Sequence, residues 1–516
     1  MASAPQLSAV DALATSGVAL LTDAASLELF AHDVYERGAD LVAVAQPADT
    51  AELSRIVCAA TSQGMAIIPR GGGMSYTGGL IAPERGALLI DTGKMDRVLD
   101  INETDMTVTV EAGCSWAKLY ETLKPKGLRT PFWGTLSGLV ATVGGAMSQN
   151  GAFWGSGRHG SAVQSCISLQ VVLADGIVVN TGAAHMRPVG PDLTGLFLGD
   201  CGAFGVKATV TLRLVREAAA HGFASFTFKL RDDVLAAITE ISHADIATEC
   251  FGFDPSLNAI RMQRDSIGSD AKALVGMMKA QGSIFEALKE GAKVVAAGRN
   301  FIDDAQFSLH ILTEGRNQPA AEADLATAKN ICGSLGGVEI ENTIPKIIRA
   351  NPFGPLNSML GPGGQRWVPI HGVVAHSKAA TCYAAIEALF EAECEAMKAH
   401  GIFSGTLLAA VGGAGIIIEP CLYWPDATNP VHEATVESSH FAKLPTLPAN
   451  PEALAVTKRI KQRLVDLFHE YDAGHFQIGR AYRYRDGLDP AADALLQAIK
   501  AQLDPQTRMN PGVLGL

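Results

Sequence analysis

Short apolar blocks separated by polar and glycine-rich stretches indicate a strand–helix–strand unit near the start of the chain. The apolar run 41–45 predicts a strand, and Asp49 or Thr50 is expected to cap the helix that follows it. A second apolar run, 65–68, predicts a buried strand that leads straight into the stretch 69–79. Five of the nine positions from 71 to 79 are glycine, so this stretch is expected to turn rather than to continue the strand.

Further along, apolar positions recur at helical spacing in some segments and at strand spacing in others, with no internal repeat. Helices are predicted from Ala24 behind an Asp23 cap and at 116–123, 379–399, 456–471 and 490–503, and strands at 88–91, 106–110, 165–173 and 177–180. Asp175-Gly176 is a strong hairpin turn between the last two strands. The uncharged run 402–418 contains four glycines, so it predicts two strands joined by a turn rather than a membrane span.

The composition is typical of a globular protein with more than one domain. The 516 residues are 48% apolar and 18% charged, which supplies ample core and gives no sign of disorder. A net charge of −12 without a long Lys or Arg run argues against nucleic acid as a partner. Nine scattered cysteines without a Cys-x-x-Cys motif fit reduced thiols, and the absence of Lys or Arg before Arg37 fits neither a secretory signal nor a transit peptide. These features predict a cytoplasmic location.

The glycine-rich stretch after Pro69 has the physical character of a phosphate site. Glycine allows positive φ and the close approach of a ligand, and successive backbone N–H groups in such a turn form a concave anion site. Arg70 adds a fixed positive charge at its mouth. The stretch is not a P-loop, because no Gly-Lys-Ser/Thr follows, and it lacks the helix start of a Rossmann fingerprint. Taken alone, it fits a phosphate cradle and an ordinary glycine-rich loop equally well.

The neighbours of this stretch extend the pattern over much of the chain. Four further blocks follow in order, namely Gly144–Gly151, Leu173–Gly176, Asp192–Val206 and, at the C-terminus, Leu503–Pro505 with Met509–Gly512. Together with Pro69–Gly79 they resemble the FAD-linked oxidases of the vanillyl-alcohol oxidase and p-cresol methylhydroxylase (PCMH) superfamily. The resemblance is strong over residues 40–215 and the C-terminal end, and weak between them.

The resemblance implies an α+β fold in three parts. Residues 1–217 would form a PCMH-type FAD-binding domain of two subdomains, and residues 218–455 an α+β cap domain over the substrate. Residues 456–516 would return to the FAD-binding domain. The change in composition after Arg216 agrees with the first of these boundaries.

The resemblance also implies FAD as the cofactor. From the residues themselves, the N–H groups of Gly71, Gly72, Gly73, Met74 and Ser75, with Arg70, would hold the pyrophosphate. By resemblance, Pro131, Thr135, Ser137, Gly144, Gly145 and Ser148 would line the second half of the cofactor, and Gly155, Ser161 and the backbone at Val206 would complete it. Met74 stands where some relatives bond flavin through histidine, so non-covalent FAD is expected, with a cap histidine or tyrosine as the alternative link. Cys201 stands where many relatives have glutamate.

Residues that could act on a substrate lie in two later stretches. His475, Tyr482 and Arg483 belong to the densest polar and aromatic cluster of the chain, and His371 ends a stretch that resembles a PCMH-type cap strand. Tyr482-Arg483 matches a pair that contacts phenolic substrate in the vanillyl-alcohol oxidase branch. Tyrosine is a directional donor and arginine a permanent cation, so the pair could stabilise a phenolate or a carboxylate. Solvated charges at a strand edge are the alternative, and His371, His475 and Tyr482 are the candidate bases.

Four residues in this part of the chain could instead ligate a metal, as in the D-2-hydroxy acid branch of the superfamily. They are His371, His376, Glu419 and His475. The glycine- and aspartate-rich His motif and the Glu-His pair of that branch are absent from this sequence. His371 and His376 would also face opposite sides of a single strand, because they are five positions apart. No catalytic metal is therefore expected.

Together these residues predict an FAD-dependent oxidoreductase that transfers hydride to flavin N5 from a carbon bearing or adjoining oxygen. A phenolic or aryl alcohol is the favoured substrate. The alternatives are a D-2-hydroxy acid such as lactate, with Arg483 holding the carboxylate, and a flavin-binding protein without turnover. Oxygen, a cytochrome or a quinone are equally open as electron acceptor, a homodimer is compatible with the sequence, and no membrane span is expected.

Overall fold

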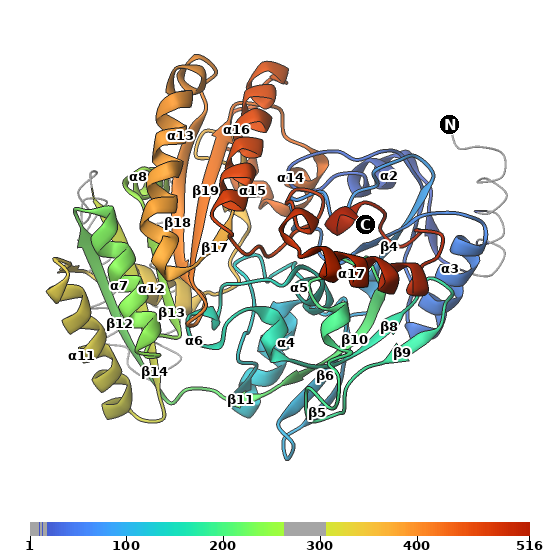
Figure 1. The fold of residues 1–516 in the computed structure, drawn as a ribbon, viewed down its shortest axis with the longest axis horizontal. Coiled ribbons are helices and arrows are strands. Elements are labelled where there is room, and N and C mark those ends of the chain that lie inside the picture. The colour runs from blue at the N-terminus through green and yellow to red at the C-terminus, as the bar shows by residue number, and fades with distance from the viewer. Residues whose placement is uncertain (1–9, 11–12, 14–17, 263–305) are drawn as a thin grey trace.

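The N-terminal half of the fold is built from two sheets with glycine-rich loops between them (Figure 1). The structure is a computed structural model that describes residues 10, 13, 18–262 and 306–516. Helices and strands are mixed throughout, which confirms the predicted α+β class. Among the described residues, no helix combines the length and apolar character that a membrane crossing requires.

The first sheet has four strands in the order β1-β2-β4-β3, and β2, β4 and β3 run parallel. Its elements are β1 (Leu20–Leu21), α2 (Ala24–Phe30), β2 (Leu41–Ala45), α3 (Thr50–Ser62), β3 (Ile67–Arg70) and β4 (Ala87–Asp91). The side chain of Asp49 accepts a hydrogen bond from the Glu52 amide and so caps α3, as predicted. Strand β3 delivers the chain into the glycine-rich loop.

The second sheet is antiparallel, with five strands in the order β5-β6-β10-β8-β9. Its strands are β5 (Val98–Asn102), β6 (Thr107–Glu111), β8 (Cys166–Val172), β9 (Val178–Asn180) and β10 (Val206–Arg213), a small ladder joins β7 (Leu128–Arg129) to β11 (Val215–Arg216), and three helices lie between, α4 (Trp116–Leu123), α5 (Val143–Gln149) and α6 (Ser156–His159). Gly176 has φ of 85° in the predicted hairpin turn between β8 and β9.

The C-terminal half contains a larger antiparallel sheet, in the order β15-β12-β14-β13-β18-β19-β16, with β17 also paired to β19. Its strands are β12 (Ala220–Phe228), β13 (Glu249–Phe253), β14 (Phe307–Gly315), β15 (Val338–Ile340), β16 (Arg366–Pro369), β17 (Gly372–Val374), β18 (Phe403–Ala410) and β19 (Ile416–Trp424). The helices are α7 (Arg231–His243), α8 (Pro255–Met262), α11 (Gln318–Ser334), α12 (Thr343–Ala350), α13 (Ala379–Ala399), α14 (Pro430–Thr435), α15 (Ser438–Phe441), α16 (Pro451–Glu470) and α17 (Pro490–Leu503).

Helices α7, α11, α13 and α16 cover one face of this sheet (Figure 1). The opposite face carries a second apolar cluster that includes Phe251, Ile417 and Phe476 and packs against Ala152 and Phe153 of the N-terminal half. The chain end then returns to the first sheet, because the Ile67 amide donates to the Arg508 carbonyl and the Asn510 amide donates to the Ile67 carbonyl, at 2.8 Å each. The C-terminal segment is thereby fixed to β3, the strand that leads into the glycine-rich loop.

The predicted elements differ from the structure mainly at their ends. Helices α4, α13 and α17 have the predicted bounds, whereas α16 begins at Pro451 rather than Val456 because the Asn450 side chain caps it by accepting from the Ala453 amide. The run 402–418 forms β18, a turn and the start of β19, as predicted. The nine cysteines are free thiols. The boundaries at 217 and 455 stay predictions as limits of independent domains.

Candidate functional site

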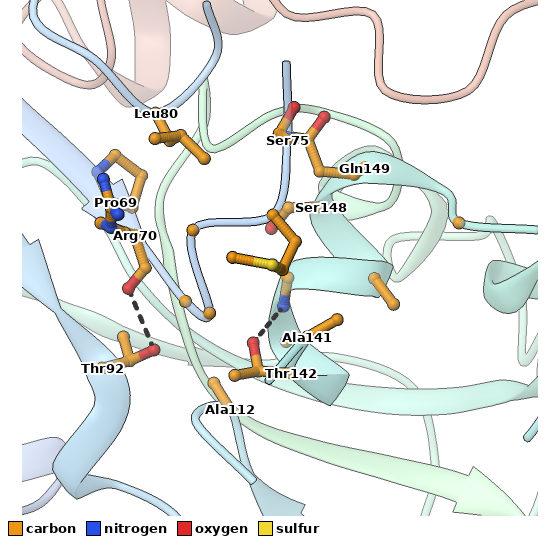
Figure 2. Close-up of a pocket in the computed structure, with 18 of the residues that line it drawn as sticks. Pro69, Arg70, Ser75, Leu80, Thr92, Ala112, Ala141, Thr142, Ser148 and Gln149 are labelled. Atoms are coloured by element: carbon orange, nitrogen blue, oxygen red, sulfur yellow. Dashed lines mark hydrogen bonds between the residues drawn. The ribbon is translucent and has the colours of Figure 1, made fainter. Parts of the chain in front are cut away.

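An open cavity of about 120 Å³ lies between the glycine-rich loop after β3, the start of α5 and strand β10. Figure 2 shows Ser75, Ser148 and Gln149 gathered at one end of the cavity and Thr92, Thr142 and Ala112 at the other. The site is therefore elongated, and its lining comes from the first 207 residues together with Gln477 of the C-terminal segment.

The backbone of the glycine-rich loop forms an open row of donors along this cavity. None of the five amides from Gly71 to Ser75 donates a hydrogen bond to another group in the described part of the chain, and all five residues line the cavity. Gly73 has φ of 73°, the conformation that curls successive N–H groups toward one point. Unpaired N–H groups of this kind need an acceptor, so the loop has the geometry of an anion site.

Arg70 supplies the positive charge behind the loop. Its guanidinium donates to the carbonyls of His32, at 2.7 Å, and Phe30, at 3.5 Å, and its Nη2 lies 2.4 Å from the place where a Cβ on Gly73 would sit. Burial lowers the pKa of Arg70 to about 10, so the side chain is still a cation at neutral pH. An anion held by the loop would lie against this fixed charge.

Close packing of two loops explains why glycine occupies positions 71 and 72. A Cβ on Gly71 would lie 2.3 Å from the Oγ1 of Thr142, and one on Gly72 would lie 2.1 Å from the carbonyl oxygen of Val140. Thr142 accepts from the Gly145 amide at 3.1 Å and so caps α5 where it meets the loop. Loop, cap and charge together fit a pyrophosphate group.

Most of the other predicted cofactor residues also line the cavity, and three do not. Thr135, Ser137, Gly144, Gly145, Ser148 and Val206 line it, whereas Pro131, Gly155 and Ser161 lie elsewhere. Gly155 is part of a turn with φ of 84°, and its amide donates to the Glu249 carboxylate at 2.9 and 3.1 Å. The contacts that these residues make with a cofactor stay predictions.

Several lining residues were missed by the sequence prediction. They are Pro69, Leu80, Thr92, Ala112, Ala141, Thr142, Ala146, Gln149, Gly151, Cys201, Lys207 and Gln477. The helix-cap pattern at Thr142 was a usable signal, since it marks a helix start directly before two glycines. Lys207 carries no local signal, because it reaches the cavity through the sheet order. Gln477 stands in the polar and aromatic cluster of the sequence, but only the return of the C-terminus brings it to the cavity.

Comparison with known families agrees with this geometry at both ends of the chain. Residues 42–182 match the FAD binding domain family, and residues 478–514 match the C-terminal domain of FAD linked oxidases. Two separate stretches of the chain thus match models of FAD-linked oxidases. FAD is its cofactor, and the cavity with its row of free amides is where the pyrophosphate fits.

Curated relatives match over part of their length only. A glycolate oxidase subunit of Bacillus subtilis is 29% identical over 49% of this chain and 54% of its own. A mitochondrial D-lactate dehydrogenase [cytochrome] of Arabidopsis thaliana is 36% identical over 33% of this chain and 29% of its own. The chain thus aligns with about half, or less, of the length of these two relatives.

Solved structures show the same fold over the whole chain. p-Cresol methylhydroxylase with bound substrate superposes with a TM-score of 0.73 at 16% identity, covering 100% of this chain and 98% of that one. An alkyldihydroxyacetonephosphate synthase superposes with a TM-score of 0.68 at 15% identity, covering 98% of this chain and 84% of that one. The predicted PCMH-type fold is confirmed, and membership of the vanillyl-alcohol oxidase branch stays a prediction.

The structure brings three of the four candidate catalytic residues together. The Tyr482 hydroxyl accepts from the His371 amide at 2.8 Å and lies 3.2 Å from Nδ1 of the same residue. Nδ1 of His475 lies 2.9 Å from the His371 carbonyl and so carries the hydrogen that it donates. The rings of His475 and Tyr482 stack at 4.0 Å. These contacts hold all three rings in fixed positions.

Burial keeps both histidines of this cluster uncharged. It lowers the pKa of His475 to about 4, and it lowers the pKa of His371 well below its usual value, with the nearby His475 as a further cause. Burial also raises the pKa of Tyr482 far above its usual value. At neutral pH the cluster is therefore a set of neutral donors and acceptors.

Tyr76 and Gln477 connect this cluster to the flavin cavity. Gln477 lines the cavity, and its Nε2 donates to the Tyr76 hydroxyl at 3.1 Å. The ring of Tyr76 meets the rings of Trp367 and His371 edge-on at 5.7 and 5.9 Å. Phe476 stacks on His371 at 3.8 Å. The result is an aromatic cluster beside the cofactor cavity, made of Tyr76, Trp367, His371, His475, Phe476 and Tyr482.

Arg483 does not join this cluster. Its side chain is 44% exposed and pairs with Asp486 at 2.8 Å and with Asp466 of α16 at 3.2 Å. Consecutive side chains of the loop diverge here, so that Tyr482 is buried while Arg483 points to the surface. The geometry corresponds to the solvated-charge alternative and gives no support to a substrate-holding role for Arg483.

The four candidate metal ligands do not come together as one set: His376 lies apart, and within the described residues the other three do not form a group that could hold an ion. His371 and His376 lie on either side of β17 rather than on one strand, and His376 contacts Thr239 and His243 instead. Within the described residues, the one group of three side chains that could hold an ion is Glu217, His221 and Glu314. Arg349 pairs with Glu217 at 2.5 Å and Arg129 pairs with Glu314, so these carboxylates already have cationic partners.

Proposed function

We propose that this protein is an FAD-dependent oxidoreductase that removes a hydride from a carbon bearing or adjoining oxygen, with an aromatic or phenolic alcohol as the preferred substrate. The aromatic cluster beside the flavin cavity is the observation that carries the proposal. Rings in edge-on and stacked contact offer an aryl substrate both apolar surface and favourable ring geometry. The buried hydroxyls of Tyr76 and Tyr482 offer it directional hydrogen bonds.

In this proposal the bound FAD supplies the two-electron acceptor. The loop from Gly71 to Ser75 and Arg70 would fix the cofactor by its pyrophosphate. The aromatic cluster would then hold the donor carbon about 3–3.5 Å from the accepting atom, the separation that near-attack geometry requires. Tyr482 would hydrogen-bond the substrate oxygen, and the Tyr482 hydroxyl itself is fixed by the His371 amide. The buried surroundings exclude water from the reacting groups.

A D-2-hydroxy acid is the second candidate substrate. The names of the matched relatives, a glycolate oxidase subunit and a D-lactate dehydrogenase, favour it. A hydroxy acid needs a cation for its carboxylate, and arginine is the residue best suited to that task. Arg483 is engaged at the surface, so this candidate would need another cation.

An anaerobic stopped-flow screen tests the proposal. Purified holoenzyme is mixed with benzyl alcohols, 4-alkylphenols and D-2-hydroxy acids, and the flavin absorbance near its visible maximum is followed. Aryl donors are expected to bleach the flavin faster than lactate or glycolate at equal concentration. Bleaching by hydroxy acids alone would replace the first candidate by the second, and no bleaching by any donor would favour a flavin-binding protein without turnover. Reoxidation of the reduced protein by oxygen, a cytochrome or a quinone would then identify the electron acceptor.

A further inference from the structure

Glu419 is a carboxylate on a strand face that is otherwise apolar. It lies on β19 opposite Leu407 of β18. Since side chains alternate along a strand, Ile417, Glu419 and Cys421 share one face. Ile417 and Cys421 belong to the apolar cluster that contains Phe476 and packs against Phe153. This face of the sheet is the one turned toward the N-terminal half of the molecule, where the flavin cavity lies.

The carboxylate has no partner that would explain its place there. Among the residues that the structure describes, no side chain donates a hydrogen bond to it and no cation pairs with it, although its neighbours on the strand are buried. Glu419 is half-buried. Carboxylates in apolar surroundings are ordinarily paired, so an unpaired one on this apolar strand face calls for a function.

The titratable groups that face Glu419 belong to the aromatic cluster. Strand register brings Glu419 next to His371, because β19 pairs Cys421 with Pro369 and Ile418 with Gly372. His371 in turn contacts Tyr482 and Tyr76. The charge of Glu419 is among the causes that raise the pKa of Tyr76 and of Tyr482. Cys421, on the same strand face, is a further cause of the raised pKa of Tyr76. His371 and His475 stack around Tyr482, as described above. A lysine also contacts the aromatic cluster. Lys461 of α16 donates to the Tyr76 carbonyl at 3.3 Å and lies over the Tyr35 ring.

We propose that Glu419 is the catalytic base that accepts the hydroxyl proton of the substrate. This inference rests on the proposed function. In the step, the carbon-bound hydrogen leaves with both electrons for the oxidised flavin, and the O–H proton passes to the Glu419 carboxylate. The carbon–oxygen single bond becomes a double bond. The alcohol is thus oxidised, the flavin is reduced by two electrons, and Glu419 ends as the neutral acid.

The ionisation of the candidate bases favours Glu419 over the two histidines. Burial raises the pKa of Glu419 to about 8, which is near the pH at which the protein would work. His475, with a pKa of about 4, would hold a transferred proton far less well. General bases are most effective when their pKa lies close to the working pH. An anionic Glu419 would also repel a substrate carboxylate, which adds to the case for a neutral aryl alcohol.

Substitution of Glu419 tests the assignment in the holoenzyme. Glu419→Gln keeps the size of the side chain and removes the base, so the rate of flavin reduction by an aryl alcohol should fall about 10²- to 10⁴-fold. Glu419→Asp should recover part of that loss. Glu391→Gln makes the same chemical change on the exposed surface of α13 and should leave the rate unchanged. FAD content and thermal stability check that each variant is folded.

The pH dependence provides the readout that a structural role would not move. In the wild type the rate of flavin reduction should rise with pH through an apparent pKa of about 8, because the carboxylate form is the active one. The Glu419→Gln variant should lose this rise. A variant with wild-type rate and an unchanged pH profile would overturn the proposal.

A measurement without substrate separates this inference from the proposed function. The infrared difference spectrum of the holoenzyme between pH 6.5 and 9.5, about 1.5 units on either side of the pKa, should show a protonated carboxyl band that disappears with a midpoint near 8. The band should be missing in Glu419→Gln and present in Glu391→Gln. If no donor reduces the flavin while the band titrates as described, the proposed function fails, but the titration of the Glu419 carboxyl near pH 8 still stands. If the wild type lacks the band, the assignment of Glu419 fails whatever the substrate.

Discussion

Placing a side chain at position 72 should expel the cofactor while the rest of the chain stays folded. A Cβ on Gly72 would lie 2.1 Å from the Val140 carbonyl oxygen, 2.6 Å from its carbonyl carbon and 3.0 Å from the Ala141 Cα. All three are backbone atoms, so the two loops must separate, and no side chain can swing away to make room. The φ of Gly72 is not in the left-handed region, so the obstacle is this contact and not the backbone angle that the sequence alone suggests for such a loop.

Overpacking of this kind costs about 1–3 kcal/mol, or about 5- to 150-fold in the dissociation constant for FAD. Gly72→Ala should fall within this range, and Gly72→Val, with two more methyl groups, should lose FAD completely. Gly333→Ala is the matched control, because a Cβ there meets no atom within 4 Å and the residue lies in α11. FAD content after chromatography, fluorescence titration of apoprotein with FAD, and circular dichroism give the comparison. A Gly72→Val protein that retains near-normal FAD would refute the placement of the pyrophosphate at this loop.

Three further outcomes follow from the site. Acid precipitation should leave the yellow colour in the supernatant, because Met74, which lines the cavity, offers no group that bonds covalently to flavin as a histidine would; colour in the pellet would reveal a covalent bond from the cap. Arg483→Ala should leave flavin reduction unchanged with aryl donors and with hydroxy acids, since the side chain is engaged at the surface, and a selective loss with hydroxy acids would restore its proposed role at a carboxylate. Tyr482→Phe should lower the free energy of unfolding by about 1–3 kcal/mol, because the buried His371 amide loses its acceptor, and an unchanged thermal midpoint would contradict that bond.

Local signals were enough to predict much of the fold. Ser115 caps α4 by accepting from the Lys118 amide, and Asp49 and Asp23 cap α3 and α2 in the same way. The turn after β3 was also predictable, because five glycines occur within nine consecutive residues; its role as a phosphate site stays a prediction. These features depend on neighbours within a few positions, which is the range over which a single sequence constrains structure.

Contacts between distant residues were not predictable in the same way. Gln477 and Tyr76 are 401 positions apart, and their hydrogen bond depends on the return of the C-terminus to the first sheet. Tyr482 and Arg483 are adjacent in sequence and both suggested a substrate site, yet an irregular loop sends one inward and the other to Asp466 on α16. Glu419 drew attention in the sequence as one of four candidate metal ligands. Its position next to His371 follows from strand pairing in the C-terminal sheet.

Single-turnover reduction of the flavin by a deuterated aryl alcohol tests the central claim most directly. Anaerobic holoenzyme is mixed with a 4-hydroxybenzyl alcohol carrying either hydrogen or deuterium on the carbinol carbon, and the loss of flavin absorbance is timed. The proposed hydride transfer predicts complete bleaching in one phase that is slower with deuterium, at every donor concentration. Bleaching at equal rates with the two donors would show that carbon–hydrogen cleavage does not limit the reduction, and absence of bleaching would contradict the proposed oxidation of aryl alcohols.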